Sequence, residues 1–328
     1  MGRVLKRSFP SERALADVVL AALRDPRRAR TEAERMGLSP EALPDLVERF
    51  VEAGVKALAD APPFPVWRQL GVSFRPTPSR DRGAVPRFRD ALRRAVVRWQ
   101  RRGVIGRFFF MNKAPGMRLR FEVSGRANAL RLVEAWLARR PEIARIEPSL
   151  YLAETYQFGG SAGSHVAHDF HADDSLRALE VMHREARGVA SASPEILSLL
   201  VVCDLVRRMT DDTFEAWDVW KRMEITGRRP RVSRSRARAM IDLVRPFVLQ
   251  PESVLPKLAA ADRRLVTAAW ATNERCATSV RRLAAEGRLL YHVRDILPFW
   301  IIFHWNRWEI EDQSALTIGI EGALDPRG

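Results

Sequence analysis

The chain has 328 residues, of which 46% are hydrophobic and 29% are charged, so its composition is that of a folded globular protein and excludes wholesale disorder. The 55 Lys and Arg residues outnumber the 40 Asp and Glu residues, which gives a formal net charge of +15. No apolar run reaches the roughly 18–20 residues of a membrane helix, and the first residues lack the apolar core of a secretory signal. We therefore expect a cytoplasmic protein. Cys203 and Cys276 lie far apart inside apolar segments, and we interpret both as packing thiols.

The first sixty residues show the spacing of amphipathic helices. Apolar residues recur at helical spacing from Leu15 to Leu23 and again from Leu46 to Val55. The segment Ala61-Pro62-Pro63-Phe64-Pro65 cannot continue a helix. We therefore predict a helical N-terminal extension over residues 1–63 and a separate body over residues 64–328.

The body of the chain first alternates between strand-like and helical segments. The order strand, helix, strand, strand, helix, strand predicts a ferredoxin-like antiparallel sheet. From Asp173 onward the pattern is predominantly helical, and the last helix is expected over residues 289–310. The predicted fold class is therefore α+β, with a large helical C-terminal part and a helical N-terminal extension. The six alternating elements are a strand over 66–74, a helix after Pro86 that runs through Trp99, strands over 106–112 and 117–123, a helix over 126–138 and a strand over 143–152.

Positive charge is concentrated in one segment. Arg228–Arg238 holds six arginines in eleven residues and no acidic residue. Two interpretations remain open: a solvated loop that enters a helix, or a docking surface for an anionic chain through Arg234, Arg236 and Arg238. Only five of the 55 basic residues are lysine, and such an arginine skew also arises from genome base composition. No zinc-finger, helix-turn-helix or RNP-like signature accompanies the charge, so nucleic acid is not the expected partner.

The chain lacks the patterns of the common cofactor-dependent sites. It has no phosphate-binding glycine loop, no H-E-x-x-H motif and no G-x-S-x-G elbow. Three of its six histidines, His165, His168 and His171, lie in one Gly- and Ser-rich segment. A metal site there lacks a thiolate and a second ligand cluster, so we interpret the segment as a glycine-rich loop and predict no metal or other cofactor.

A few polar residues have spacings that favour chemistry. Arg118 and Arg120 alternate with apolar residues, so both point to one face of a strand and form either a carbonyl or carboxylate clamp or a solvated edge. Glu154 is a candidate base or their salt-bridge partner. Tyr291 opens the expected last helix, where its phenol is either a hydrogen-bond donor to substrate or a buried tyrosine with a satisfied hydroxyl. His304, on the same helix, is either an acid or base or a structural imidazole.

Four segments then form an ordered set of motifs. Gly106–Phe121 combines an aromatic strand, a Pro-containing turn and an R-x-R strand, and Glu154–Gly160 follows with a terminal Gly-Gly. Phe170–Ser175 ends in Asp-Ser, and Phe303–Arg307 ends in Asn-Arg. In the same order these segments resemble the thiopeptide-type bacteriocin biosynthesis domain, which also forms the C-terminal elimination part of lantibiotic dehydratases.

Two departures from that pattern separate branches of the family. In members that eliminate glutamate, the arginine of E-x-x-R and a histidine four residues before Asn-Arg serve the elimination, whereas this chain has Gln157 and Ile302 there. The chain is therefore more similar to stand-alone thiopeptide pyridine synthases. These enzymes join two dehydroalanines by a formal 4+2 aza-cycloaddition, with loss of water and of the leader peptide, and they need no cofactor.

The resemblance also implies partners and site residues. The expected partners are an acidic leader peptide, docked on Arg234, Arg236 and Arg238 or on the N-terminal extension, and a dehydrated, thiazole-containing core peptide. The alternatives are glutamate elimination from glutamylated Ser or Thr, and a basic peptide- or nucleic-acid-binding protein without chemistry. We expect the site residues to converge on one cleft. The expected catalytic residues are Tyr291, His304 and Glu154, and the expected substrate contacts are Arg118, Arg120, His168, Asn306 and Arg307.

Overall fold

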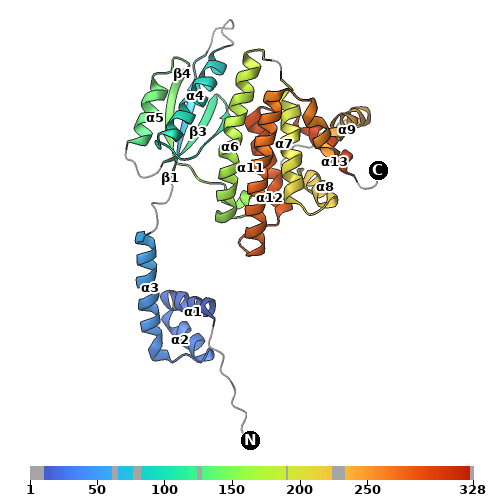
Figure 1. Cartoon of the computed structure of the whole chain (residues 1–328). Helices are drawn as coiled ribbons and strands as arrows, with labels where there is room; N and C mark the ends of the chain where they lie inside the picture. The colour runs from blue at the N-terminus through green and yellow to red at the C-terminus, as the bar shows by residue number, and fades with distance from the viewer. Residues whose placement is uncertain are drawn as a thin grey trace. The chain divides into compact units, whose positions relative to one another are not determined.

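A computed structural model of the chain describes residues 11–60, 66–76, 83–123, 128–189, 191–223 and 233–325. The chain divides into two compact units, Met1–Phe64 and Pro65–Gly328 (Figure 1). The proline-rich segment that we predicted as the boundary, residues 61–65, lies outside the described residues.

The N-terminal unit is a small helical cluster. Its elements are α1 (Glu12–Arg24), α2 (Pro26–Arg35), the short 3-10 helix η1 (Pro40–Ala42) and α3 (Leu43–Asp60). The Ser11 hydroxyl accepts a hydrogen bond from the Ala14 amide at 3.3 Å and so caps the first of these helices. Small and branched residues form its core, namely Val18, Ala22, Ala29, Ala33 and Leu43.

The second unit begins with the predicted sheet. Its four strands pair in the order β2-β3-β1-β4, and every pairing is antiparallel. This order, with one helix after β1 and one after β3, confirms the ferredoxin-like arrangement and the α+β class. The elements are β1 (Val66–Phe74), α4 (Ala84–Arg101), β2 (Phe108–Lys113), β3 (Gly116–Val123), α5 (Ala129–Ala138) and β4 (Ile143–Ser149).

The two faces of the sheet differ in chemistry. One face carries apolar residues such as Leu70, Leu119 and Phe121, and α4 and α5 cover it (Figure 1). For example, the Trp99 ring of α4 lies edge-on to Phe121, with 6.2 Å between the ring centroids. On the other face Gln69 and Arg120 are paired across neighbouring strands, and both are buried. Because side chains alternate along a strand, this single sheet has an apolar side and a polar side.

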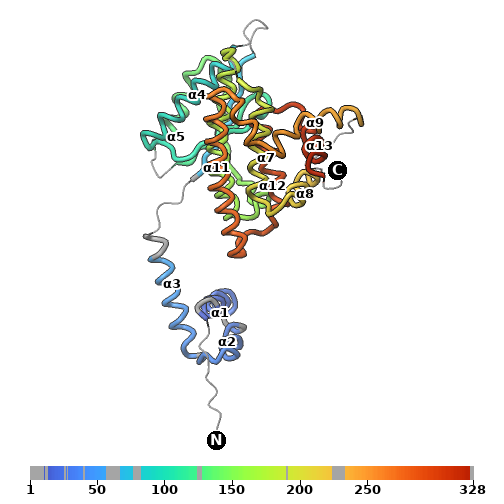
Figure 2. Tube along the Cα trace, turned by 45° about the vertical axis from the view of Figure 1, so that its right-hand side comes forward, coloured from blue at the N-terminus to red at the C-terminus, as the bar shows by residue number. Residues whose placement is uncertain are grey.

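Helices make up the rest of this unit. The long helix α11 packs between α6 and α7, and α13 packs against α9 and α8 (Figures 1 and 2). No described helix has both the length and the apolar content that a membrane crossing requires. The elements are η2 (Thr155–Phe158), α6 (Ser161–Ala186), α7 (Pro194–Met209), α8 (Thr213–Lys221), α9 (Arg234–Leu249), α10 (Pro251–Val254), η4 (Leu255–Lys257), α11 (Ala260–Ala285), α12 (Val293–Trp308) and α13 (Gln313–Leu324).

Two sequence predictions are wrong here. The segment predicted as a glycine-rich loop is helical from Ser161, because only Gly159 and Gly160, before the helix, have positive φ angles (78° and 95°). Gly163 lies inside the helix, where a Cβ would come within 1.8 Å of the Phe158 carbonyl oxygen, so glycine lets α6 approach η2 closely. The helix predicted as the last one starts only at Val293, and α13 follows it.

Candidate active site

The polar face of the sheet contacts α6, and Arg120 lies at the centre of this contact. Its side chain is only 4% exposed. The guanidinium donates to Gln69 Oε1 at 2.8 Å and to Glu154 Oε1 at 3.4 Å. It also lies over the rings of Phe109 and Tyr151, at 5.0 and 4.5 Å from their centroids. One carboxylate, one amide and two aromatic faces therefore compensate the buried charge.

Tyr151 and His168 form a hydrogen-bonded pair beside Arg120. The phenol oxygen lies 2.8 Å from His168 Nε2. Burial, reinforced by the nearby positive charge of Arg107, lowers the pKa of His168 to about 3. Burial likewise raises the pKa of the Tyr151 phenol above its usual value of 10. At neutral pH both groups are therefore uncharged, and the phenol is the donor when the imidazole carries its proton on Nδ1.

His171 lies one turn further along α6 and is also buried. Its ring is surrounded by aromatic rings, including those of Phe109 and Phe303 at centroid distances of 5.6 and 5.4 Å. Burial lowers the pKa of His171 well below its usual value. Within the described part of the chain, several buried polar atoms of this region have no hydrogen-bond partner in the protein. They are Arg120 Nη1, Glu154 Oε2, Gln157 Oε1, Ser164 Oγ, His168 Nδ1 and both ring nitrogens of His171.

The two neutral imidazoles predict a pH-dependent stability. An unfolded histidine takes up a proton near pH 6.5, whereas His168 in the folded body does so only near pH 3. Between these values the unfolded state binds more protons, so lowering the pH removes up to about 1.4 kcal/mol of stability per pH unit for each imidazole. We expect the free energy of unfolding to fall between pH 6.5 and pH 5. Denaturant titrations followed by tryptophan fluorescence measure this loss in the body alone, because all nine tryptophans lie beyond residue 64.

The matched control for this prediction lies on the same helix. His168→Gln should reduce the slope of stability against pH more than His165→Gln does, since His165 is exposed. Equal slopes in the wild type and the His168 variant would contradict the assignment.

The structure brings only some of the predicted site residues together. Arg120, Glu154 and His168 belong to the group just described. Arg118 points to the same sheet face but is exposed at the level of Gly71. Tyr291 precedes α12, and its ring contacts Tyr156 with 4.7 Å between the centroids. Hydrogen bonding to Tyr156 raises the pKa of Tyr291 to about 12.

The predicted residues of α12 belong to a second network. His304 contacts Asp174 through Nδ1 and Ser198 through Nε2, each at 2.9 Å. Arg307 donates to the same Asp174, and all four side chains are buried. Asn306 accepts a hydrogen bond from Gln313 at 3.3 Å. Within the described part of the chain, the hydrogen-bond partners of His304 and Arg307 just named, Asp174 and Ser198, do not belong to the Arg120 group.

The second network explains two of the sequence motifs. β2 is an edge strand, and the Phe110 amide donates to the Ser175 hydroxyl at 3.2 Å. The Phe110 carbonyl accepts from Arg307 Nε, also at 3.2 Å. Asn112 donates to the carbonyls at the end of α12, at 3.1 and 3.2 Å. The Asp-Ser and Asn-Arg motifs therefore join the edge of the sheet to the helical part.

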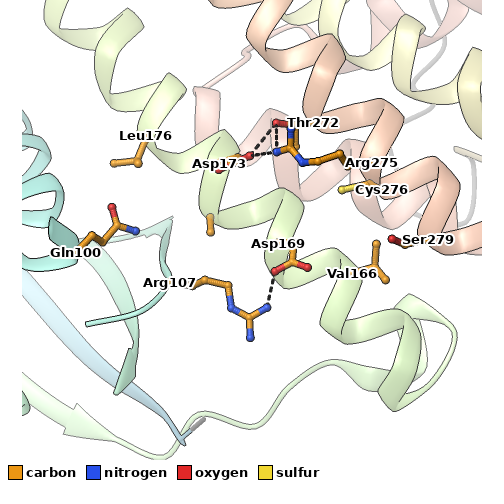
Figure 3. Close-up of a pocket in the computed structure, with 11 residues that line it drawn as sticks. Gln100, Arg107, Val166, Asp169, Asp173, Leu176, Thr272, Arg275, Cys276 and Ser279 are labelled. Carbon is orange, nitrogen blue, oxygen red and sulfur yellow. Dashed lines mark hydrogen bonds and ion pairs between the residues drawn. The ribbon is translucent and has the colours of Figure 1, made fainter. Parts of the chain in front are cut away.

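A polar pocket of about 410 Å³ lies beside α6, between the end of α4 and α11 (Figure 3). Ion pairs from Arg107 to Asp169 and from Arg275 to Asp173 line it (Figure 3). Arg107 also pairs with Glu122 of the polar sheet face at 2.7 Å. Arg107 therefore connects this pocket to the polar sheet face on which Arg120 lies.

The sequence predicted neither a metal site nor a reactive thiol, and the structure shows how the possible metal ligands and the two cysteines lie. In the part of the chain that the structure describes, no three His, Cys, Asp or Glu side chains are arranged to hold a metal ion. Cys203 and Cys276 are free and buried, and burial raises the pKa of each to about 12. Cys276 also lines the pocket beside α6.

Comparison with known proteins gives the family. The family model described as "Lantibiotic biosynthesis dehydratase C-term" matches residues 78–317. The chain belongs to this family. The resemblance inferred from the motifs is therefore confirmed. No curated protein sequence matches the chain.

Two solved structures are similar to this family member. The tRNA-dependent lantibiotic dehydratase MibB from Microbispora sp. 107891 matches 79% of the chain with a TM-score of 0.56 and 17% identity. The match covers only 28% of the MibB chain, so it concerns a part of that protein. TsrL matches 79% of the chain and 94% of its own length, with a TM-score of 0.46 and 14% identity. The likeness to MibB shows a shared fold.

Tyr151 and Trp67 also belong to the group around Arg120 and His168, although neither was predicted as a site residue. The Trp67 ring contacts the rings of Phe109 and His168, at centroid distances of 5.1 and 4.8 Å. Its alternation with Gln69 in a strand was a usable signal, since both point to the face that carries Arg120. The strand expected over residues 143–152 ends at Ser149, so Tyr151 lies beyond β4 and strand alternation does not give its direction.

Proposed function

We propose that this family member is a thiopeptide pyridine synthase and not a glutamate eliminase. The motif resemblance assigns elimination to a guanidinium and an imidazole, and this chain has neither at those positions. Ile302 is buried among apolar side chains of α12, and Gln157 is uncharged. Among the described residues, Arg120 is the guanidinium that contacts Glu154. Because Glu154 already compensates its charge, this guanidinium suits a neutral peptide carbonyl better than a departing glutamate carboxylate.

The proposed reaction is redox-neutral. An amide beside one dehydroalanine shifts its N–H proton to the carbonyl oxygen, which gives an iminol and a 2-azadiene. Two carbon–carbon σ bonds close the six-membered ring: the methylene carbon and the iminol carbon at the two ends of the 2-azadiene bond to the two alkene carbons of the second dehydroalanine, and the π electrons of diene and alkene supply both bonds. Water then leaves, and the leader peptide departs as an amide when the ring becomes aromatic. Holding the two alkenes together supplies on the order of 7–11 kcal/mol of the barrier.

The Tyr151–His168 pair is the observation that carries this proposal. An amide-to-iminol shift needs one group to accept a proton from nitrogen and another to donate one to oxygen. A neutral phenol bonded to a neutral imidazole at 2.8 Å can do both without creating a buried charge. Arg120 and Glu154 beside the pair would bind the peptide carbonyl and amide, and Tyr291 with Tyr156 would contact the substrate from outside.

Exposed apolar residues beside this group suit a thiazole-bearing peptide. Leu150, Leu152, Tyr156 and Leu290 are 67–75% exposed. The first three flank Tyr151 and Glu154 in the sequence, and the Leu290 amide donates to the Gly159 carbonyl, just after η2, at 3.0 Å. Exposed apolar surface of this kind marks a contact for a partner or ligand. The aromatic heterocycles of a core peptide would cover it.

Mass spectrometry of a synthetic peptide tests the proposal. The substrate carries a leader, thiazoles and two dehydroalanines, and the buffer contains a chelator but no nucleotide. We expect a cyclised core that has lost one water and the leader amide. An unchanged dehydrated peptide, together with loss of glutamate from a glutamylated Ser peptide, would instead establish elimination. Dependence on added metal or nucleotide would contradict the predicted absence of cofactors.

A further inference from the structure

The outward face of α4 is strongly basic. The helix Ala84–Arg101 contains six arginines and one aspartate, and Arg102 follows directly. Its other face is apolar, with Leu92, Val96 and Trp99 buried against the sheet. The arginines therefore gather on one side of the helix. We call Arg94, Arg98, Arg101 and Arg102 the α4 arginine face.

Most of this face lacks acidic neighbours. Arg94 pairs with Asp90. Arg98, Arg101 and Arg102 are exposed and form no ion pair with any residue that the structure describes. Their spacings of three and four place like charges side by side on the helix, which lowers helix stability. Arg98 and Arg101 lie in the last turn, where the helix dipole favours positive charge, and the mutual repulsion of neighbouring arginines opposes this gain. An anionic partner would relieve the repulsion.

The arginines of α9, which the sequence predicted as a docking surface, differ in this respect. Arg236 pairs with Asp312, and Arg238 lies 3.6 Å from Asp242. Part of their charge is therefore compensated within the protein. Residues 228–232 of the same basic run lie outside the described residues.

The α4 arginine face adjoins a route to the candidate active site. A hollow of about 340 Å³ lies along it, lined by Arg93, Val97 and the face itself. Gln100, in the same turn, lines the polar pocket beside α6 together with Arg107 (Figure 3). Arg107 in turn pairs with Glu122 and lies 5.5 Å from the Trp67 ring centroid. An extended chain bound to α4 can therefore continue along the pocket to the polar sheet face.

We infer that the α4 arginine face binds the acidic part of the peptide substrate, an inference that rests on the proposed function for the identity of that substrate. In an extended chain, carboxylates on every second residue lie about 6–7 Å apart, close to the spacing of guanidiniums one helical turn apart, and can form charge-assisted hydrogen bonds with them. An RNA strand is the less suitable partner, because Trp99, the aromatic residue of this segment, is buried and offers no surface for base stacking.

Direct binding measurements test this surface without any turnover. The probe is a fluorescein-labelled peptide of alternating Glu and Ala, and its Gln–Ala counterpart is the neutral control. We compare full-length wild type with the triple variants Arg98→Gln/Arg101→Gln/Arg102→Gln and Arg234→Gln/Arg236→Gln/Arg238→Gln, which lose the same charge. The α4 variant should bind the Glu peptide about tenfold more weakly, as the loss of three exposed ion pairs implies. The α9 variant should lose clearly less, and higher salt should weaken wild-type binding.

Each outcome decides for or against the inference. Unchanged binding by the α4 variant, or a larger loss in the α9 variant, would overturn it, as would an oligouridylate that the wild type binds more tightly than the Glu peptide. An unaltered melting temperature of the α4 variant shows that its weaker binding is not caused by misfolding. Since the assay measures docking alone, a positive result stands even if the cyclisation assay fails, and a negative result leaves that assay unaffected.

Discussion

Replacement of Asp174 by Asn is expected to lower the free energy of unfolding by about 3–5 kcal/mol, because it leaves a buried guanidinium without its counter-charge. Asp174 accepts hydrogen bonds from His304 and Trp308 at 2.9 and 2.8 Å and pairs with Arg307. Its carboxylate is fully buried, which would raise its pKa, but the electrostatic attraction of His304 and Arg307 and the hydrogen bonds from His304 and Trp308 outweigh burial and lower the pKa to about 2. A loss of this size is a large part of the about 5–15 kcal/mol that holds a typical domain together.

The neighbouring residue supplies the control. Asp173 is 39% exposed and pairs with Arg275 at the surface, so Asp173→Asn should cost less than about 1 kcal/mol. Urea titration followed by tryptophan fluorescence compares the two in the body alone. Similar losses in both variants would contradict a special role for the buried network. A double variant that replaces Asp174 and Arg307 by apolar residues of similar size should recover part of the stability.

Replacement of Tyr151 by Phe is expected to lower the cyclisation rate by about 100-fold, since it removes the hydroxyl that completes the proposed proton relay. The ring remains under Arg120, so the cation–π contact at 4.5 Å is retained and substrate binding should change little. The measurement is kcat and KM for the synthetic peptide, and the effect should fall on kcat.

Tyr291→Phe is the matched comparison for this effect. It removes one hydroxyl from a tyrosine that lies against Tyr156 outside the buried group. We expect a loss below about tenfold, because that hydroxyl would assist binding more than proton transfer. A larger loss for Tyr291→Phe than for Tyr151→Phe would move the proton-transfer role to Tyr291, as the sequence analysis expected.

The sheet was predictable because its strands obey simple alternation. The predicted strand Val66–Phe74 matches β1 at both ends. The part of helix α6 before Asp173 was missed because its buried face mixes polar and apolar residues, with His168 and His171 directed inward beside Phe170. A helix that buries histidine and aspartate gives no apolar periodicity to detect. The interpretation as a loop followed from two glycines that in fact stand just before the helix.

The candidate site was predictable only in part, for a related reason. Strand alternation placed Arg118 and Arg120 on one face, but burial differs between them because only Arg120 lies under the aromatic rings of neighbouring segments. His304 and Arg307 are three residues apart, and this helical spacing places them on one face of α12. What these two contact depends on Asp174, which is far away in the sequence. Local sequence patterns indicate which way a side chain points, whereas the residues that it contacts depend on tertiary packing.

The two borders of the sheet differ in how they resist association with other molecules. β4 has exposed charges at Arg145 and Glu147 and a proline at position 148, which offers no N–H group to an incoming strand. β2 begins with three phenylalanines, and side chains of α6 and α12 occupy the backbone groups of Phe110 on its outer side. Both borders are therefore closed to strand addition between molecules, β4 by charge and proline and β2 by the helices packed against it.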